Sequence, residues 1–235
     1  VFAARDPELG RMVALKLLHA DTEDDTARER LRREARTAAG ISHPNICQVY
    51  EVGEHEGEMF LAMELLEGEA LSEIVERGAL PPADALEHLV QVLRGLGALH
   101  AQGFVHRDLK PSNIFVTPHG TKLLDFGLAL ALGDALVDAD MRLTQTGALV
   151  GTPAFMAPEQ WLGEPVGVAT DVFAVGALAF ELLTGKPAFD GASPMEVFHA
   201  IAHEDPPALV GGPQVAALDR ILQRAMAKDP ADRYS

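Results

Sequence analysis

Apolar and polar residues alternate over the first part of the chain, the pattern of strands with one buried face. The stretch "VFAARDPELGRMVALKLL" contains two such runs, and Pro7 and Gly10 between them are typical turn residues, so it predicts a hairpin. A second stretch, "ICQVYEVGEHEGEMFLAMELL", predicts another hairpin that turns within "GEHEG". The first 66 residues are therefore expected to be rich in strands.

Helical spacing replaces this alternation elsewhere. Thr26 and Glu29 have capping-box spacing before "RERLRREARTAAG", which predicts one helix between the hairpins, ended by Gly40. Beyond Gly68, "PPADALEHLVQVLRGLGALHAQG" begins with prolines and has apolar residues at helical spacing, so it predicts a long amphipathic helix. Further helices are predicted at residues 171–184, 194–203 and 215–227.

The two halves of the chain thus differ in kind. We predict an α+β fold with two lobes: a small β-rich lobe with one helix over residues 1–66, and a larger, mainly helical lobe over residues 67–235. A length of 235 residues suits one such two-lobed domain. The hinge is expected near "MELLEG".

Charge and cysteine content narrow the classes of partner and compartment. A net charge of -16 argues against nucleic acid as a partner, because DNA binding depends on Lys and Arg neutralising phosphates. Cys47 is the only cysteine, so no disulfide forms within the chain and a reducing, cytoplasmic setting is expected.

No membrane segment is expected in this chain. Its longest apolar run, "VFAVGALAF", is well short of the ~20 residues that a membrane helix needs, and it is interpreted as a buried core helix. The opening "VFAARDPELG" has none of the features of a signal peptide. A membrane anchor outside this segment stays an open alternative.

The densest group of polar residues is "HRDLKPSN", residues 106–113. Asp108 can accept a proton, Lys110 supplies a cation, and the side-chain oxygen of Asn113 suits a hard divalent ion. Asp125, in "LLDFG", adds a second oxygen ligand. Together they indicate a metal-assisted transfer site, whereas the plainer alternative is that they only cap loops and form turns. The flanking segments "GFV" and "IFV" are predicted to be strands that hold the loop rigid.

Four short segments resemble, in order, those of the eukaryotic-type protein kinases, and most of all the bacterial serine/threonine kinases. The segments are "VALK" at 13–16, "HRDLKPSN" at 106–113, "DFG" at 125–127 and "APE" at 157–159. Each string alone is a weak signal, but four in the expected order and context are specific. The resemblance covers nearly the whole chain and implies a serine/threonine protein kinase that uses ATP and Mg²⁺, with Mn²⁺ as the alternative ion.

The resemblance also implies roles for the polar group. Asp108 would accept the proton of the substrate hydroxyl, Lys110 would steady the transferred phosphoryl group, and Asn113 and Asp125 would hold magnesium. These are the groups that phosphoryl transfer requires, because its catalysis is mainly positioning and charge stabilisation.

Other residues are implied to bind the nucleotide. Lys16 corresponds to the lysine that binds the α and β phosphates, and Glu34 to its ion-pair partner. Glu29 is the alternative partner, and Glu34 on a solvated helix face is the plainer interpretation.

The adenine pocket is implied by residues with less sequence signal. Ala14 would cover the adenine face, Met63 would close the back of the pocket, and Glu64 and Leu66 would offer backbone hydrogen bonds to the base. Without the resemblance, "FLAMELL" indicates only a buried strand.

The segment from Asp125 to Glu159 is implied to control activity. A phosphate on Thr144 or Thr146 could pair with Arg107 and order the segment, with a homodimer as one route to autophosphorylation. Ordinary loop threonines are the alternative.

Other residues of the family pattern have structural or substrate-related roles. Thr152 is implied to contact the catalytic loop and to favour Ser and Thr over Tyr substrates. The resemblance also implies that Glu159 pairs with Arg233 and that Asp171 anchors the catalytic loop.

The chain departs from the family pattern at both ends. No "GxGxxGxV" precedes Lys16, and family members continue beyond the position of Arg233. The resemblance therefore implies that this chain is a segment of a larger protein. The ATP affinity and the stability of the segment are both expected to be impaired.

Other functions fit the sequence less well. A P-loop nucleotidase is disfavoured because "GxxxxGK[ST]" is absent. His199 and His203 have metal-compatible spacing, but a solvated helix face explains them better. A pseudokinase that signals by binding is the serious alternative, although Lys16, Asp108 and Asp125 are all present. A small-molecule kinase is disfavoured by the "APE" and "GTP" segments.

Overall fold

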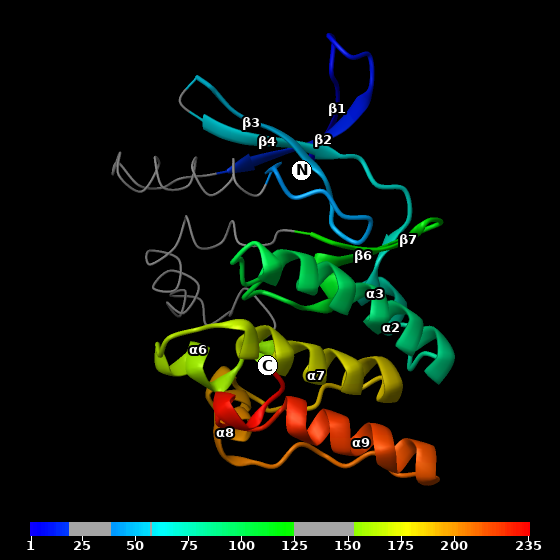
Figure 1. The fold of residues 1–235 in the computed structure, drawn as a ribbon, viewed down its shortest axis with the longest axis vertical. Coiled ribbons are helices and arrows are strands. Elements are labelled where there is room, and N and C mark those ends of the chain that lie inside the picture. The colour runs from blue at the N-terminus through cyan, green and yellow to red at the C-terminus, as the bar shows by residue number, and fades with distance from the viewer. Residues whose placement is uncertain (19–38, 57, 125–152) are drawn as a thin grey trace.

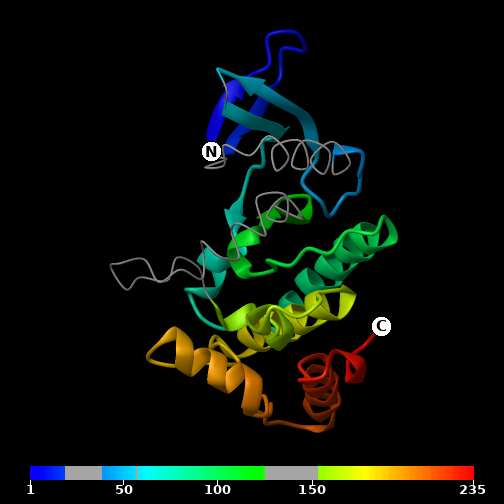
Figure 2. The same cartoon turned by 90° about the vertical axis from the view of Figure 1, so that its left-hand side faces the viewer.

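The computed structural model describes residues 1–18, 39–56, 58–124 and 153–235. The helix predicted from Thr26 and Glu29 lies outside these residues. A four-stranded sheet occupies one end of the molecule, helices α7 to α9 occupy the other, and a small second sheet lies between them beside α3 (Figures 1 and 2). The predicted α+β class, with a strand-rich N-terminal part and a helical C-terminal part, is confirmed.

The first sheet is antiparallel with the strand order β1-β2-β4-β3. Both predicted hairpins are present in it. The Asp6 carboxylate holds the first turn by accepting hydrogen bonds from the backbone N–H groups of Glu8 and Leu9, both at 3.0 Å. Gly10 has a φ of 68°, a conformation that costs glycine little. The strands are β1 (Phe2–Arg5), β2 (Met12–Leu18), β3 (Val49–His55) and β4 (Glu58–Glu64).

The register of this sheet brings several predicted site residues together. Ala14 on β2 lies opposite Met63 on β4, and Lys16 lies opposite Leu61. Because residues two apart on a strand point the same way and opposed residues share a face, all four lie on one face of the sheet. On this face Leu61 is buried against Val49 in a small core.

The remainder of the chain is mainly helical. Helix α8 has the predicted bounds, and α9 begins two residues before its predicted start, with Pro213 in its first turn, where proline needs no hydrogen bond. Helix α7 begins at Val168 rather than at residue 171, because the hydroxyl of Thr170 accepts a hydrogen bond from Gly167 N–H and closes an earlier first turn. The elements are β5 (Glu69–Ala70), α2 (Leu71–Val75), α3 (Pro82–Ala101), η1 (Pro111–Asn113), β6 (Ile114–Thr117), β7 (Gly120–Leu123), η2 (Pro153–Phe155), α6 (Pro158–Leu162), α7 (Val168–Thr184), α8 (Pro194–His203), α9 (Pro213–Ala225) and η3 (Pro230–Asp232).

Helices α3 and α7 pack together around the main hydrophobic core. The apolar run that the sequence places in a core helix is α7, where Phe173, Leu178 and Leu182 are fully buried. Each such side chain contributes about 1.5–3 kcal/mol through burial alone. This core supports β6 and β7. The polar loop at residues 106–113 follows α3 and leads into β6.

The segment from His43 to Cys47 ties the two parts of the molecule together. The backbone N–H of Cys47 donates to Leu123 O, and Leu123 N–H donates to Asn45 O, both at 2.9 Å. The side chain of Asn45 also donates to Thr121 O at 2.9 Å. Residues that come just before β3 in the sequence are thus bonded to β7, which precedes Leu124 and Asp125.

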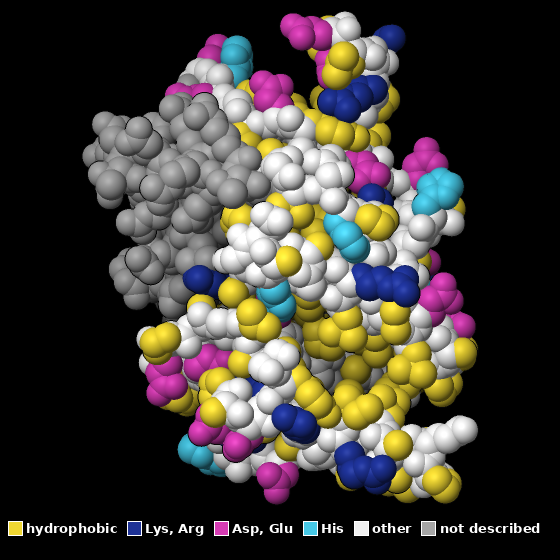
Figure 3. Space-filling view, viewed as in Figure 1, with side chains coloured by type: hydrophobic (Ala, Val, Ile, Leu, Met, Phe, Trp, Pro, Cys, Tyr) yellow, Lys and Arg dark blue, Asp and Glu magenta, His cyan; other side chains and the backbone are white. Residues whose placement is uncertain are grey.

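Lys and Arg side chains are scattered over the visible face and are interspersed with Asp and Glu (Figure 3). Of the helices that the structure describes, none combines the length and the apolar character needed to cross a bilayer.

Candidate active site

The polar loop "HRDLKPSN" connects the segment after α3 to β6. The segment "IFV" after it is β6, as predicted, but the predicted strand at "GFV" is wrong. Gly103 adopts a φ of 78°, and Phe104 N–H donates to Leu99 O, which closes the end of α3 instead of pairing with a strand. The N-terminal side of the loop is therefore held in place by some other contact.

That contact is Asp171, a fully buried residue in the first turn of α7. Its Oδ2 accepts a hydrogen bond from His106 N–H at 2.8 Å, and its Oδ1 accepts one from Arg107 N–H at 2.9 Å. The imidazole Nε2 of His100 lies 2.7 Å from Oδ2. The implied role of Asp171 as an anchor is confirmed by these bonds.

Arg107 has an uncommon backbone conformation for a side chain of its size. Its φ is 65°, in the left-handed region that only glycine enters easily. Its N–H is bound to Asp171, and its carbonyl accepts a 2.7 Å hydrogen bond from Gln160 Nε2 on α6. Two side chains from distant helices therefore stabilise a strained residue directly before Asp108, as is common at functional sites.

Asp108, Lys110 and Asn113 form one hydrogen-bonded group. Lys110 Nζ lies 2.8 Å from Asp108 Oδ2, and Asn113 Nδ2 donates to the same oxygen at 2.7 Å and to Asp108 O at 2.8 Å. Asn113 is buried, whereas the Asp108 side chain is 44% exposed. A carboxylate is thus held by a buried amide while part of it stays accessible to a substrate.

The geometry of Asn113 fits a metal ligand. Both of its side-chain hydrogen bonds use Nδ2, and its Oδ1 has no partner among the described residues. Leu124 N–H donates to Asn113 O at 2.8 Å. The residue directly before Asp125 is therefore bonded to Asn113. Asp125 itself lies outside the described residues.

The other candidate metal residues do not form a complete site. In the described part of the chain no three His, Cys, Asp or Glu side chains are grouped to hold an ion. The rings of His199 and His203 lie 4.9 Å apart. His199 also lies 3.8 Å from Glu204, and the side chains of both residues are well exposed. The geometry of His199 and His203 therefore fits a solvated helix face better than a metal site.

The residues proposed for the nucleotide lie on the first sheet and beyond it. Ala14, Lys16 and Met63 share one face, as the register requires. Leu66 lies in the connection between β4 and β5 and is half-buried. Glu34, the implied partner of Lys16, lies outside the described residues, as do Thr144, Thr146 and Thr152.

The side chain of Glu64 has a partner that the sequence did not indicate. Its Oε2 lies 2.8 Å from Lys122 Nζ on β7 and accepts a hydrogen bond from Gln48 N–H at 3.3 Å. The resemblance implied only backbone contacts for Glu64. This ion pair joins the end of β4 to the strand that leads toward Asp125.

The predicted pair Glu159 and Arg233 is present and buried. Arg233 Nη1 and Nη2 lie 2.7 and 2.9 Å from the two carboxylate oxygens, and the hydroxyl of Thr170 donates to Oε1 at 2.8 Å. Burial raises the pKa of Glu159, but the hydrogen bonds from Arg233 and Thr170 outweigh it and hold the pKa below its ordinary value. Since Gln160 follows Glu159 directly, this pair fixes the helix that holds Arg107.

Two residues that support the loop carry no clear signal in the sequence. Gln160 accepts a hydrogen bond from Ala157 N–H at 3.0 Å and donates to Arg107 O, so it links the "APE" segment to the catalytic loop. His100 lies on α3 like any half-buried helix residue. Only the packing of α3 and α6 against the loop assigns them these contacts.

Comparison with known proteins agrees with this geometry. A family model described as "Protein kinase domain" matches residues 1–235. The chain is 39% identical to the probable serine/threonine-protein kinase PknB of Corynebacterium glutamicum and 40% identical to a probable serine/threonine-protein kinase of Streptomyces coelicolor. Both matches cover all of this chain, which spans only 38% and 36% of the length of those relatives.

A solved structure has the same fold. The crystal structure of the Mycobacterium tuberculosis PknI kinase domain matches with a TM-score of 0.74 and 28% sequence identity. The match covers 99% of this chain and 84% of that domain.

Proposed function

The chain belongs to the protein kinase family, and on that premise we propose that it transfers the γ-phosphoryl group of ATP to Ser and Thr hydroxyls of proteins. The family uses ATP, a divalent metal and protein substrates. The observation that carries the proposal is the group formed by Asp108, Lys110 and Asn113 on a loop that Asp171 fixes from the core.

Asp108 acts on the substrate hydroxyl. Its Oδ2 is held by Lys110 and Asn113, which leaves Oδ1 to accept the proton as the hydroxyl oxygen attacks the γ-phosphorus. The bond from that phosphorus to the bridging oxygen breaks, and ADP leaves. A fixed orientation matters more than basicity, because phosphoryl transfer depends mainly on positioning. Lys110, already beside the carboxylate, places a positive charge where negative charge develops on the transferred group.

The nucleotide and its metal are held from both parts of the molecule. Lys16 would bind the α and β phosphates, with Glu34 as its ion-pair partner, and Asn113 and Asp125 would supply oxygen ligands to Mg²⁺. Mg²⁺ is the proposed ion and Mn²⁺ the alternative, since both are bound by carboxylate, carbonyl and phosphate oxygens. When bound, ATP supplies the phosphoryl group, and Mg²⁺ neutralises part of the negative charge of its phosphates. Ala14 and Met63 line the adenine site, and Glu64 and Leu66 contribute backbone groups.

Arg107 connects this chemistry to regulation. Its backbone is fixed by Asp171 and Gln160, so its side chain starts from a defined position next to Asp108. Phosphorylation of Thr144 or Thr146 would add about -1.5 to -2 charge that can pair with Arg107 and order the segment. Thr152 is proposed to act on the catalytic loop and to favour Ser and Thr substrates. Autophosphorylation between two copies of the chain is the proposed route.

The proposed division of labour is between residues 1–66, which hold the nucleotide, and residues 67–235, which hold the substrate and the catalytic loop. Transfer is proposed to take place in the cytoplasm, where ATP is available. The thiol of Cys47 is buried, and the sequence holds no second cysteine that could form a disulfide with it, which is compatible with that reducing setting.

The experiment is transfer of labelled phosphate from Mg-ATP to the protein itself and to a generic basic protein, with modified sites mapped by mass spectrometry. Asp108→Asn should lower the rate about 10²–10⁴-fold, because it removes the general base but keeps the size of the side chain. Glu8→Gln, an exposed change far from the loop, is the matched control.

Label on Thr144 or Thr146 that disappears in Asp108→Asn would support an autophosphorylating kinase. Equal labelling in both proteins would contradict the role of Asp108. A folded protein that binds ATP but transfers no label would instead support the pseudokinase alternative.

A further inference from the structure

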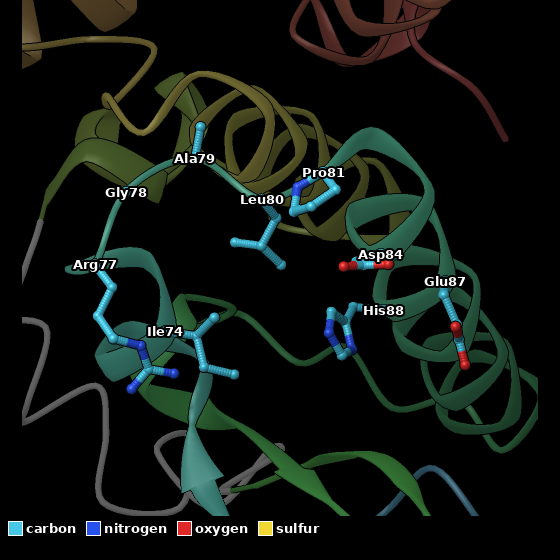
Figure 4. Close-up of a pocket in the computed structure, with 9 residues that line it drawn as sticks. All are labelled: Ile74, Arg77, Gly78, Ala79, Leu80, Pro81, Asp84, Glu87 and His88. Atoms are coloured by element: carbon cyan, nitrogen blue, oxygen red, sulfur yellow. The ribbon is translucent and has the colours of Figure 1, made fainter.

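A hollow of about 380 Å³ lies between α2 and the N-terminal half of α3, away from the catalytic group. Ile74 and Leu80 lie toward its middle, with Arg77 on one side and Asp84, Glu87 and His88 on the other (Figure 4). Its volume is within the range of ligand sites, but most of its lining residues are exposed, so it is open to solvent. An open hollow suits a chain that passes across it better than an enclosed small molecule.

The walls of the hollow are held by contacts that do not need an occupant. Leu80 N–H donates to Leu182 O on α7 at 2.8 Å, and the ring of His88 is fixed by a 2.9 Å hydrogen bond between its Nδ1 and Thr121 Oγ1. A Cβ on Gly185 would lie 2.9 Å from Ala79 N, so the end of α7 closely supports the connection before α3. The site is therefore preformed.

The available charge in the hollow is negative. Arg77 is bound by both oxygens of Glu69, at 2.7 and 2.9 Å. This pair lowers the pKa of Glu69 and raises that of Arg77, so the one cation of the lining already has its counterion. Asp84 and Glu87, in contrast, are exposed and make no hydrogen bond or ion pair with the described residues. Charge complementarity favours a cationic occupant, since an anion would meet two carboxylates.

The hollow is also connected to the active site. Helix α2, which supplies Ile74, packs directly against η1, the short helix that ends at Asn113. Leu71 and Val75 on this helix are buried in the main hydrophobic core. A protein bound at the hollow would therefore be held close to the catalytic loop without covering it.

We propose that this hollow docks a flexible segment of the protein substrate, in which Arg or Lys residues lie near Leu, Ile or Val. The cationic groups contact Asp84 and Glu87, and the apolar side chain covers Ile74 and Leu80. The proposal rests on the proposed kinase function and adds to it a substrate class: proteins that carry a basic and apolar segment apart from the phosphorylated residue.

The first test uses a synthetic decapeptide that contains arginines and leucines separated by glycines and has no hydroxyl residue. Its binding to the protein is measured by calorimetry, without ATP. The double variant Asp84→Asn/Glu87→Gln should weaken binding about tenfold, and Glu87→Arg should weaken it at least as much. The control Glu8→Gln/Glu51→Gln removes two exposed carboxylates elsewhere and should leave binding unchanged.

The second test compares phosphorylation of a short substrate peptide with and without the docking sequence attached. In Asp84→Asn/Glu87→Gln, KM should rise about tenfold for the fused peptide only, with kcat unchanged. Equal affinity in wild-type and variant protein, or equal binding of a decapeptide with glutamates in place of arginines, would overturn the docking site. The first test needs no ATP, so the two proposals can fail separately. A decapeptide that does not bind a protein with intact phosphate transfer counts only against docking. A decapeptide that binds a protein without phosphate transfer counts only against the kinase function.

Discussion

Two loops of this protein are each organised by one aspartate that accepts two backbone N–H groups. Asp6 bonds Glu8 and Leu9 at 3.0 Å, two and three residues away, and these bonds are exposed. Asp171 bonds His106 and Arg107 at 2.8 and 2.9 Å, across more than 60 residues of sequence, and is fully buried.

The chemistry is the same, but its consequences differ. At Asp6, water can replace either partner, so the carboxylate mainly selects a turn that Gly10 already allows. At Asp171 no water replaces a lost bond, and the loop there has no strand on its N-terminal side. A loop without regular structure can be rigid when a buried side chain satisfies its backbone, and in this protein that loop carries the proposed catalytic group.

The largest effect is expected from Asp171→Ala. It would leave two backbone N–H groups and His100 without their acceptor, which should lower the free energy of unfolding by about 4 kcal/mol. The strained conformation of Arg107 would also lose one of its two supports. Chemical denaturation measures this loss; a change below about 1 kcal/mol would show that Asp171 is not the main support of the loop.

Glu159→Gln should have a similar but slightly smaller effect, about 3 kcal/mol, because it leaves the buried guanidinium of Arg233 without a full counterion. This loss should depend on pH. The folded pKa of Glu159 is below its ordinary value of 4.5, so its contribution is fully present above that value and is lost as the pH falls through the folded pKa.

The measurement is the difference in unfolding free energy between wild-type protein and Glu159→Gln at several pH values. It should be constant near neutral pH and shrink below about pH 4.5. A difference that stays constant into strong acid would contradict the assignment.

Gln160→Ala sharpens the comparison by removing the second support of Arg107. We expect a loss of about 1–2 kcal/mol in the free energy of unfolding, since two half-buried hydrogen bonds disappear, one from Ala157 N–H and one to Arg107 O. The transfer rate should fall by more than this loss of stability explains. The backbone of Arg107 would then keep the hydrogen bond from its N–H to Asp171 but lose the one to its carbonyl. Leu162→Ala, an exposed change on the same helix, is the control. Equal transfer rates in Gln160→Ala and this control would contradict a positioning role.

The smallest effect is expected from Asp6→Ala, the local, half-buried counterpart of Asp171→Ala. The melting temperature should change by less than about 2 °C, because solvent replaces both hydrogen bonds of the turn. Transfer of phosphate should not change. A loss comparable to that of Asp171→Ala would break the contrast between local and distant carboxylates.

Much of the fold could be predicted from local pattern. Alternation predicts both hairpins, and the spacing of apolar residues predicts α3, α7, α8 and α9 to within three residues at their starts. Pattern failed at "GFV", because three apolar residues indicate burial and not strand pairing. There Phe104 bonds back to the end of α3.

The contacts of the candidate site could likewise be predicted only in part. The sequence alone determined the group formed by Asp108, Lys110 and Asn113. These residues lie within eight positions of one another, so they meet once their loop is formed. Resemblance to a family supplied Asp171 and the pair of Glu159 with Arg233. Neither route indicated the bond from Gln160 to Arg107 or the ion pair of Glu64 with Lys122.

Those contacts were decided only by the tertiary structure. Periodicity reports which face of a helix or strand is buried, because that depends on neighbours a few residues away. It does not report which distant group lies against that face. The packing of α3, α6 and α7 around one core brings these groups within hydrogen-bond distance, and burial then makes each bond costly to lose.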